Sequence, residues 1–186
     1  ILQRSRSSAF GEAGWGYDRP TQNLYNEYEA GDARRDETIL TPTDEQIETP
    51  AQEIYCGDRM LNRKYAMYND GANGVIYKLA HATRSPKNNR QIRYADVLLM
   101  YAEAMNEQGK MSQEVWNATL RPIRQRAGFT LASALDYPAT ATQADMRDII
   151  RRERRCELAL EGLPWFDIKR WRIGKQCLDG YVLGAR

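Results

Sequence analysis

The chain has 186 residues, of which 42% are hydrophobic and 28% charged, as in ordinary globular domains long enough to bury a core. Its 27 Lys and Arg against 25 Asp and Glu leave a net charge of only +2, which argues against a nucleic-acid partner. The widely spaced Cys56, Cys156 and Cys177 offer no CxxC zinc motif, and no apolar run approaches the ~20 residues of a membrane helix.

The first half of the chain shows little regular periodicity. We expect residues 1–90 to form a loop-rich cover with one short helix, which Thr21 caps and Gly31 ends. The charged run "RRDE" that begins at Arg34 is interpreted as a solvated or helix-terminal cluster. The chain opens on "ILQRSRSS" without a methionine or a lipid-accepting cysteine, so we expect a piece of a longer protein.

The second half is helical in pattern. Residues 91–108 predict a helix that ends at Gly109, with Asp96, Glu103 and Glu107 opposite its apolar face. The residues of that face are Tyr94, Val97, Leu98, Tyr101 and Met105. They predict where a neighbouring helix packs.

Three further helices are predicted. The second spans residues 113–127, has Trp116, Leu120 and Ile123 on one face, and contains Pro122, which predicts a kink or a broken turn. The third runs from its Thr142 cap to residue 161, and the fourth spans residues 164–171. We therefore expect a mainly α fold in a single piece, with helical hairpins at residues 91–172 and a tail at 173–186.

The third predicted helix carries an unusual pair of acids. Glu153 and Glu157 fall within its apolar face, one turn apart at about 5–6 Å, a separation that retaining glycoside hydrolases use. The alternative is that both carboxylates are buried and paired with Arg124 and Arg126. We favour the paired, structural interpretation, because catalytic acids more often come from different elements around a cleft.

Several sequence blocks together resemble the SusD/RagB family of nutrient-binding outer-membrane lipoproteins, in its C-terminal half. These blocks are "IRYADVLLMYAEAMNEQGK", "LRPIRQRAGF", "RDIIRRERRCELALEGLPWFDIKRW" and the earlier "PTQNLYNEYEAGDARRDETIL". Arg121-Pro122 departs from the family pattern, in which an asparagine precedes the basic segment. The resemblance implies tetratricopeptide-like helical hairpins with long irregular loops.

The resemblance also implies a function. Family members bind oligosaccharides or other nutrients at the bacterial cell surface and deliver them to a SusC-like, TonB-dependent transporter. They are not enzymes, and they are held at the outer membrane by a lipid anchor that is absent from this chain. We expect no cofactor and no metal site. Two alternatives from other classes are a glycoside-processing enzyme that uses Glu153 and Glu157, and a helical scaffold that binds only another protein.

Aromatic residues in the first loop are the predicted carbohydrate site. Trp15 and Tyr17, between Gly14 and Gly16, offer flat faces for sugar rings, and Asp18 and Arg19 offer hydrogen bonds to hydroxyls. The alternative for Trp15 is packing against the helical core. Trp116, Trp165 and Trp171 fall in helical patterns and are predicted to lie in the core.

Overall fold

A computed structural model describes residues 20–41, 60–62, 64 and 91–179 of the chain. The described part is mainly helical, which confirms the predicted fold class. The chain divides into two compact units, one of residues 26–35 and 90–174, called the helical unit below, and one of all other residues. In the described part, none of the helices is long and apolar enough to cross a membrane.

The described elements before residue 90 and after residue 173 are short. Helix α1 (Gln22–Glu27) begins where predicted, because the Thr21 hydroxyl accepts a hydrogen bond from the Leu24 N–H at 3.2 Å. After helix α2 (Arg34–Thr38), strand β1 (Ile39–Leu40) pairs antiparallel with strand β2 (Leu61–Asn62). Helix α10 (Gly174–Leu178) is the last described element.

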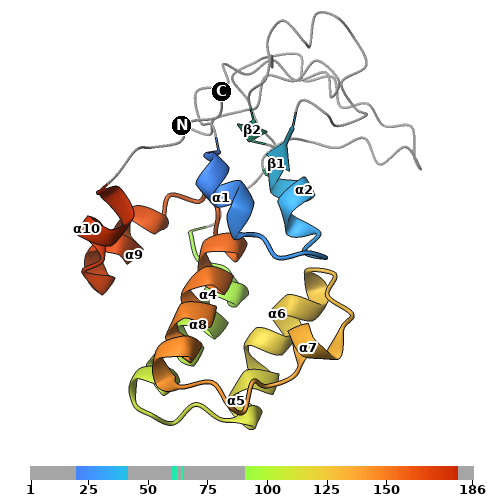
Figure 1. The fold of residues 1–186 in the computed structure, drawn as a ribbon, viewed down its shortest axis with the longest axis vertical. Coiled ribbons are helices and arrows are strands. Elements are labelled where there is room, and N and C mark those ends of the chain that lie inside the picture. Colours follow the sequence, from blue (N-terminus) through green and yellow to red (C-terminus); the bar gives the residue numbers. More distant parts are fainter. Residues whose placement is uncertain (1–19, 42–59, 63, 65–90, 180–186) are drawn as a thin grey trace, which may run out of the picture. The chain divides into compact units, whose positions relative to one another are not determined.

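The helical unit is built on two longer helices that pack against each other, α4 (Tyr94–Glu107) and α8 (Gln143–Glu157) (Figure 1). The other helices are α5 (Gln113–Ala118), α6 (Leu120–Arg126), α7 (Ala132–Leu135) and α9 (Pro164–Trp171). The core joins α4, α5, α6 and α8 through the buried side chains of Ala102, Trp116, Leu120, Met146 and Ile150. One apolar core thus holds the hairpin and α8 together.

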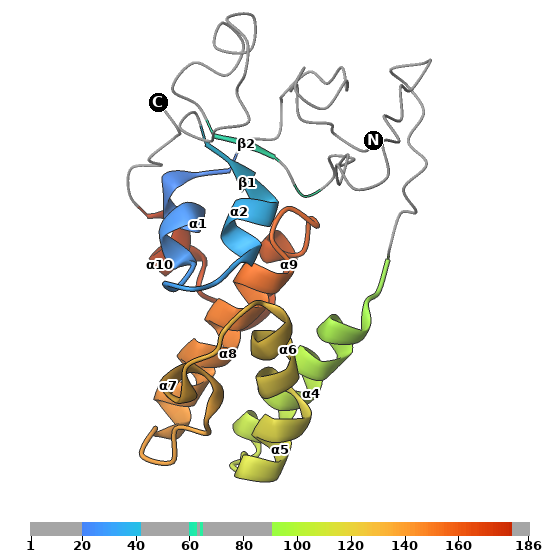
Figure 2. The ribbon, with the colours of Figure 1, turned by 90° about the vertical axis from the view of Figure 1, so that its right-hand side faces the viewer.

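The predicted break at Pro122 is confirmed. Helices α5 and α6 are separate, consecutive elements that meet at Thr119, whose backbone (φ −123°, ψ −79°) is not helical (Figure 2). Proline has no N–H to donate to a carbonyl one turn earlier, so a new helix starts two residues before it, at Leu120, where that donor is not needed. Trp116, Leu120 and Ile123 nevertheless stay on one buried face, as predicted.

The predicted packing face of α4 is wrong. Tyr94, Val97 and Tyr101 are 77%, 44% and 50% exposed, and the buried side chains belong to Asp96, Leu99, Ala102 and Asn106. Polar side chains can be buried here because α8 provides their hydrogen-bond and ion-pair partners. The Asn106 amide donates to the carbonyl of Gln143 at 3.1 Å, and Asp96 pairs with Arg154.

Helix α8 begins as predicted and ends earlier. The Thr142 hydroxyl accepts from the Asp145 N–H at 3.2 Å, while the Asp145 carboxylate accepts from the Thr142 N–H at 2.9 Å. The helix ends at Glu157 and not at residue 161, and the chain turns through Leu160 and Gly162, which both have positive φ. This turn brings α9 back, so that it begins at Pro164 as predicted.

We expect Thr142→Ala to lower the free energy of unfolding by about 1 kcal/mol, because it removes the acceptor for the Asp145 N–H and one partner of a reciprocal cap. Urea unfolding followed by circular dichroism measures the change. Thr140→Ala, two residues earlier on the exposed loop, is the control and should leave stability nearly unchanged. Equal losses in the two variants would contradict a capping role.

The tryptophans differ in environment. Trp116 is buried as predicted, and its indole N–H donates to the Leu135 carbonyl at 2.7 Å. The prediction is wrong for Trp165, which is 52% exposed with the Lys169 ammonium 4.9 Å from its ring centre. Trp171 is half-buried, and the guanidinium groups of Arg151 and Arg170 lie 4.8 and 4.6 Å from its ring centre.

Candidate functional site

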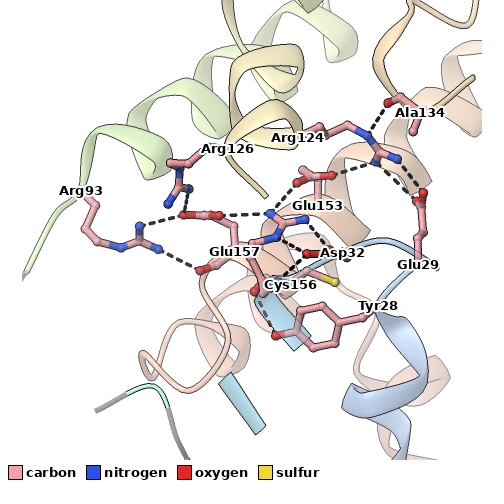
Figure 3. A network of polar contacts seen from close by, with 11 residues as sticks. Tyr28, Glu29, Asp32, Arg93, Arg124, Arg126, Ala134, Glu153, Cys156 and Glu157 are labelled. Atoms are coloured by element: carbon pink, nitrogen blue, oxygen red, sulfur yellow. Dashed lines mark hydrogen bonds and ion pairs between the residues drawn. The ribbon is translucent and has the colours of Figure 1, made fainter. Parts of the chain in front are cut away.

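The predicted carbohydrate residues Trp15, Tyr17, Asp18 and Arg19 lie outside the described residues. The structure instead describes the acids that the alternative, catalytic interpretation singled out. They lie in a buried network of ionised side chains in the helical unit (Figure 3). This charged cluster consists of Glu29, Asp32, Arg34, Arg93, Arg124, Arg126, Glu153, Glu157 and Glu161.

Glu153 lies at the centre of the charged cluster, and its side chain is only 2% exposed. One carboxylate oxygen accepts from Arg34 at 2.6 Å and the other from Arg124 at 2.9 Å. Arg124 also donates to the Ala134 carbonyl at 2.6 Å and to Glu29 at 2.6 Å. The predicted pair of Glu153 with Arg124 is therefore confirmed.

Glu157, one turn further along α8, is equally buried and has three arginine partners. One oxygen accepts from Arg93 at 2.8 Å and from Arg126 at 2.5 Å, which confirms the predicted partner Arg126. The other oxygen accepts from Arg34 at 3.1 Å. Arg93 also donates to the Glu157 carbonyl at 2.8 Å and to Glu161, so it holds both the side chain and the end of the helix.

The charged cluster is built to hold segments together. The two carboxylates of the α8 pair point at arginines from the first residue of α2, from the residue before α4, and from α6 (Figure 3). Their oxygens are already engaged and shielded from water, so a glycosidic bond has no access to either acid. The separation that resembles a catalytic pair is here a consequence of one helical turn.

Burial and ion pairing have opposite effects on the pKa values of these carboxyl groups. Burial raises the pKa of Glu153 against the opposing charges of Arg34 and Arg124. Burial also raises the pKa of Glu157, but hydrogen bonds from Arg93 and Arg126 outweigh this effect and hold the pKa below the ordinary value of 4.5. Burial raises the pKa of the neighbouring Cys156 thiol to about 12, so this thiol stays protonated and unreactive at neutral pH.

The low pKa of Glu157 predicts a loss of stability in acid. A carboxylate with a lower pKa in the folded than in the unfolded chain stabilises the fold fully above the unfolded pKa, and this contribution disappears as the pH falls through the folded pKa. We therefore expect the free energy of unfolding of the natural chain to exceed that of Glu157→Gln at neutral pH. This difference should become smaller as the pH falls below 4.5, the ordinary pKa of a glutamate. Urea unfolding of both proteins across this range measures it. A difference independent of pH would contradict the expected ionisation.

Five members of the charged cluster were not among the predicted ion pairs: Glu29, Asp32, Arg34, Arg93 and Glu161. The solvated alternative for Arg34 is wrong, because its side chain is 13% exposed and bridges Asp32, Glu153 and Glu157. The helix-terminal alternative is confirmed, because Arg34 is the first residue of α2. The sequence held no local signal for the pairs with α8, because Arg34 lies 119 positions from Glu153 and Arg93 lies 64 positions from Glu157. Helical periodicity relates only residues that are close in sequence.

A second ionic group connects α4, α8 and α9. Arg154 is 5% exposed and pairs with Asp96 of α4 and, at 2.8 Å, with Asp167 of α9. Arg170 pairs with Asp167 at 2.7 Å and with Glu103 at 2.5 Å. In the described part of the chain, no group of His, Cys, Asp and Glu side chains has the geometry to hold a metal ion.

Comparisons with known proteins agree on one family. The family model of the SusD family matches residues 3–185 of the chain. The chain is 34% identical to SusD-like protein P2 of Formosa agariphila in an alignment of 179 residues that covers 90% of this chain and 33% of P2. SusD-like protein P38 of the same organism is 35% identical over 81 residues, which are 42% of this chain and 16% of P38. The chain thus spans a third or less of these relatives.

Solved structures show the same fold. Surface glycan-binding protein A from Bacteroides fluxus aligns at a TM-score of 0.60 and 27% identity, covering 99% of this chain and 37% of that protein. A SusD homolog from Bacteroides thetaiotaomicron aligns at a TM-score of 0.58 and 25% identity, covering 81% of this chain and 31% of the other. Because the SusD family model matches residues 3–185, nearly the whole of this chain, the chain belongs to the SusD family.

Proposed function

We propose that the protein binds oligosaccharide nutrients at the bacterial cell surface and does not transform them. The observation that carries this proposal is the match of the SusD family model to residues 3–185. Its likeness to a surface glycan-binding protein at 27% identity supports the same ligand class. The charged cluster supports a binding role over an enzymatic one, because its paired acids are buried and occupied by arginines.

The proposed function includes delivery and location. In the whole protein, bound ligand passes to a SusC-like, TonB-dependent transporter in the outer membrane, and a lipid holds the protein at the outer surface. Purification of the full-length protein from detergent-solubilised outer membranes tests both points. Co-purification of a TonB-dependent transporter supports them, and recovery of the protein alone in the aqueous fraction contradicts them.

Within the chain, we propose that Trp15, Tyr17, Asp18 and Arg19 bind the glycan. A sugar ring presents C–H groups on its faces and hydroxyls at its edge. Aromatic plates exclude water from the faces, while carboxylate and guanidinium groups form charge-assisted hydrogen bonds with the hydroxyls. The glycines on both sides of Trp15 suit a loop that brings the plate close to its ligand.

We expect Trp15→Ala to weaken glycan binding about tenfold, equivalent to about 1.4 kcal/mol, without lowering the melting temperature. A glycan array selects the ligand, and isothermal titration calorimetry gives its dissociation constant. Trp165→Ala, which removes an exposed tryptophan of the helical unit, is the matched control and should leave affinity unchanged. A melting temperature that falls while affinity holds would assign Trp15 to the core instead.

The same samples separate the two alternative classes. Release of reducing ends from a bound oligosaccharide would indicate a glycoside-processing enzyme. Absence of binding to every glycan, together with capture of a transporter, would indicate a scaffold whose only partner is a protein. Binding without product release supports the proposal.

A further inference from the structure

The helical unit contains a pocket of about 340 Å³ beside the charged cluster. Its walls come from the segment between α1 and α2 and from the loop between α6 and α7 together with the start of α7. The side chains that matter for binding belong to Glu29, Phe129, Thr130, Leu131 and Ser133. None of these residues belongs to the proposed site at Trp15.

The two walls are fixed against each other. The Ala33 N–H donates to the Ala127 carbonyl at 2.9 Å, and Gly31 and Gly128 turn the chain on either side with φ of +88° and +96°. A Cβ on Gly128 would lie 3.3 Å from the Ala33 side chain, so the close approach favours glycine. Phe129 is held under the Arg124 guanidinium, 4.4 Å from its ring centre. The pocket is therefore part of the folded structure and does not need a ligand to form.

The charge of the pocket favours a neutral ligand. Glu29 is its acidic side chain, and its carboxylate accepts from Arg124 at 2.6 Å and from Arg152 at 3.3 Å. A cationic ligand would compete with both arginines for this carboxylate. A ligand hydroxyl can instead donate to an unused lone pair of the Glu29 carboxylate while both arginines stay bound, because each carboxylate oxygen accepts more than one hydrogen bond.

The remaining lining combines hydroxyls with apolar surface. The hydroxyls of Thr130 and Ser133 are exposed, and neither forms a hydrogen bond with another of the described residues. The Leu131 side chain, 70% exposed, provides an apolar surface at the same place. The volume is at the low end of small-molecule sites, which suits one ring and excludes a chain of several.

We infer that this pocket binds one neutral, hydroxyl-bearing ring, such as a single sugar unit, with Glu29, Thr130 and Ser133 as its hydrogen-bonding groups. Leu131 then contacts the C–H face of the ring. The inference rests on the proposed function for the source of such a ligand. It adds a second place where one unit of a glycan binds.

Titration of the isotope-labelled chain with methyl α-glucoside, methyl α-galactoside and methyl α-mannoside, followed by NMR, tests the inference. At least one of them should give saturable shifts of the Gly31, Gly128 and Thr130 amides. The double variant Thr130→Val/Ser133→Ala should weaken that binding about tenfold to a hundredfold, since each lost hydrogen bond accounts for roughly threefold to tenfold. Thr140→Val, an exposed threonine outside the pocket, is the control and should bind as the natural chain does.

Other results would overturn the inference. These are an absence of saturable shifts at the three amides, saturation by methylammonium and not by the glycosides, or unchanged affinity in the double variant. Ser133→Trp, which fills the pocket, should also abolish the shifts while its amide spectrum remains that of a folded protein. Binding of an oligosaccharide that Trp15→Ala weakens and the pocket variants do not would overturn this inference and leave the proposed function standing.

Discussion

Arg34→Ala is expected to lower the free energy of unfolding by about 3–5 kcal/mol, among the largest effects of any single substitution in the chain. The Arg34 guanidinium donates to Asp32 at 2.6 Å and to Glu153 and Glu157 at 2.6 and 3.1 Å. Its removal leaves these carboxylates buried with less compensating charge, and the surrounding apolar atoms cannot replace water as a solvent. Urea unfolding at neutral pH, followed by circular dichroism, measures the change.

Arg121→Ala is the matched control for this experiment. Arg121 forms a single ion pair with Asp136 at 3.4 Å, and the two side chains are 36% and 62% exposed. Exposed pairs contribute about 0–1 kcal/mol, so the control should be close to the natural chain. If both variants lost the same small amount, the charged cluster would be as weak as a surface pair. Arg34→Lys should be intermediate, because an ammonium group cannot reproduce the planar fork that reaches several carboxylates.

Local signals in the sequence predicted the helix boundaries well, because capping and helix breaking depend on neighbouring residues. Thr142 caps α8, Pro122 separates α5 from α6, and Pro164 starts α9. The end of α8 was predicted too late, at residue 161 and not at Glu157. Arg93 and Leu160 show why. Arg93 lies far away in sequence yet binds the last carbonyl of the helix, and Leu160 already turns with positive φ.

Burial was harder to predict than helicity, because it depends on partners distant in sequence. Three residues of the predicted apolar stripe of α4, Tyr94, Val97 and Tyr101, are exposed, whereas Asp96 is buried beside Arg154. Helical periodicity shows which residues share a face, but it does not show which face a neighbour covers. Arg34 was misplaced for the same reason, as its partners on α8 lie more than a hundred residues later.

In the candidate site, too, the features set by neighbouring residues could be predicted, and the contacts between distant segments could not. The inward position of Glu153 and Glu157 followed from one helical wheel, and their partners Arg124 and Arg126 were chosen from the preceding predicted helix. The pocket beside Glu29 was not predicted, because its walls come from distant segments that meet through the Ala33–Ala127 hydrogen bond and the Arg124–Glu29 ion pair. The charged cluster fixes Glu29 at that wall, so the same arginine that pairs with Glu153 also orients a group of the pocket.

Arg154→Ala is expected to have a similarly large effect, again about 3–5 kcal/mol in the free energy of unfolding. Arg154 lies on the same helix as Glu153 but faces α4 and α9, where it pairs with Asp96 and Asp167. Both carboxylates are almost fully buried, so neither gains water when the arginine is removed. The adjacent Arg155→Ala is the matched control. Arg155 pairs with Glu27 at 3.1 Å through side chains about a third exposed, so a loss of about 1 kcal/mol or less is expected.

A double-mutant cycle shows where the loss from Arg154→Ala originates. If it comes from stranded carboxylates, Asp96→Asn should destabilise the natural chain but cost little or even restore stability in the Arg154→Ala background, because the amide removes a buried charge that no longer has a partner. If the loss comes only from the missing bulk of the arginine side chain, the two substitutions should add. Additive losses would therefore contradict an electrostatic origin, and the sign of the coupling decides between charge and packing as the link between α8 and α4.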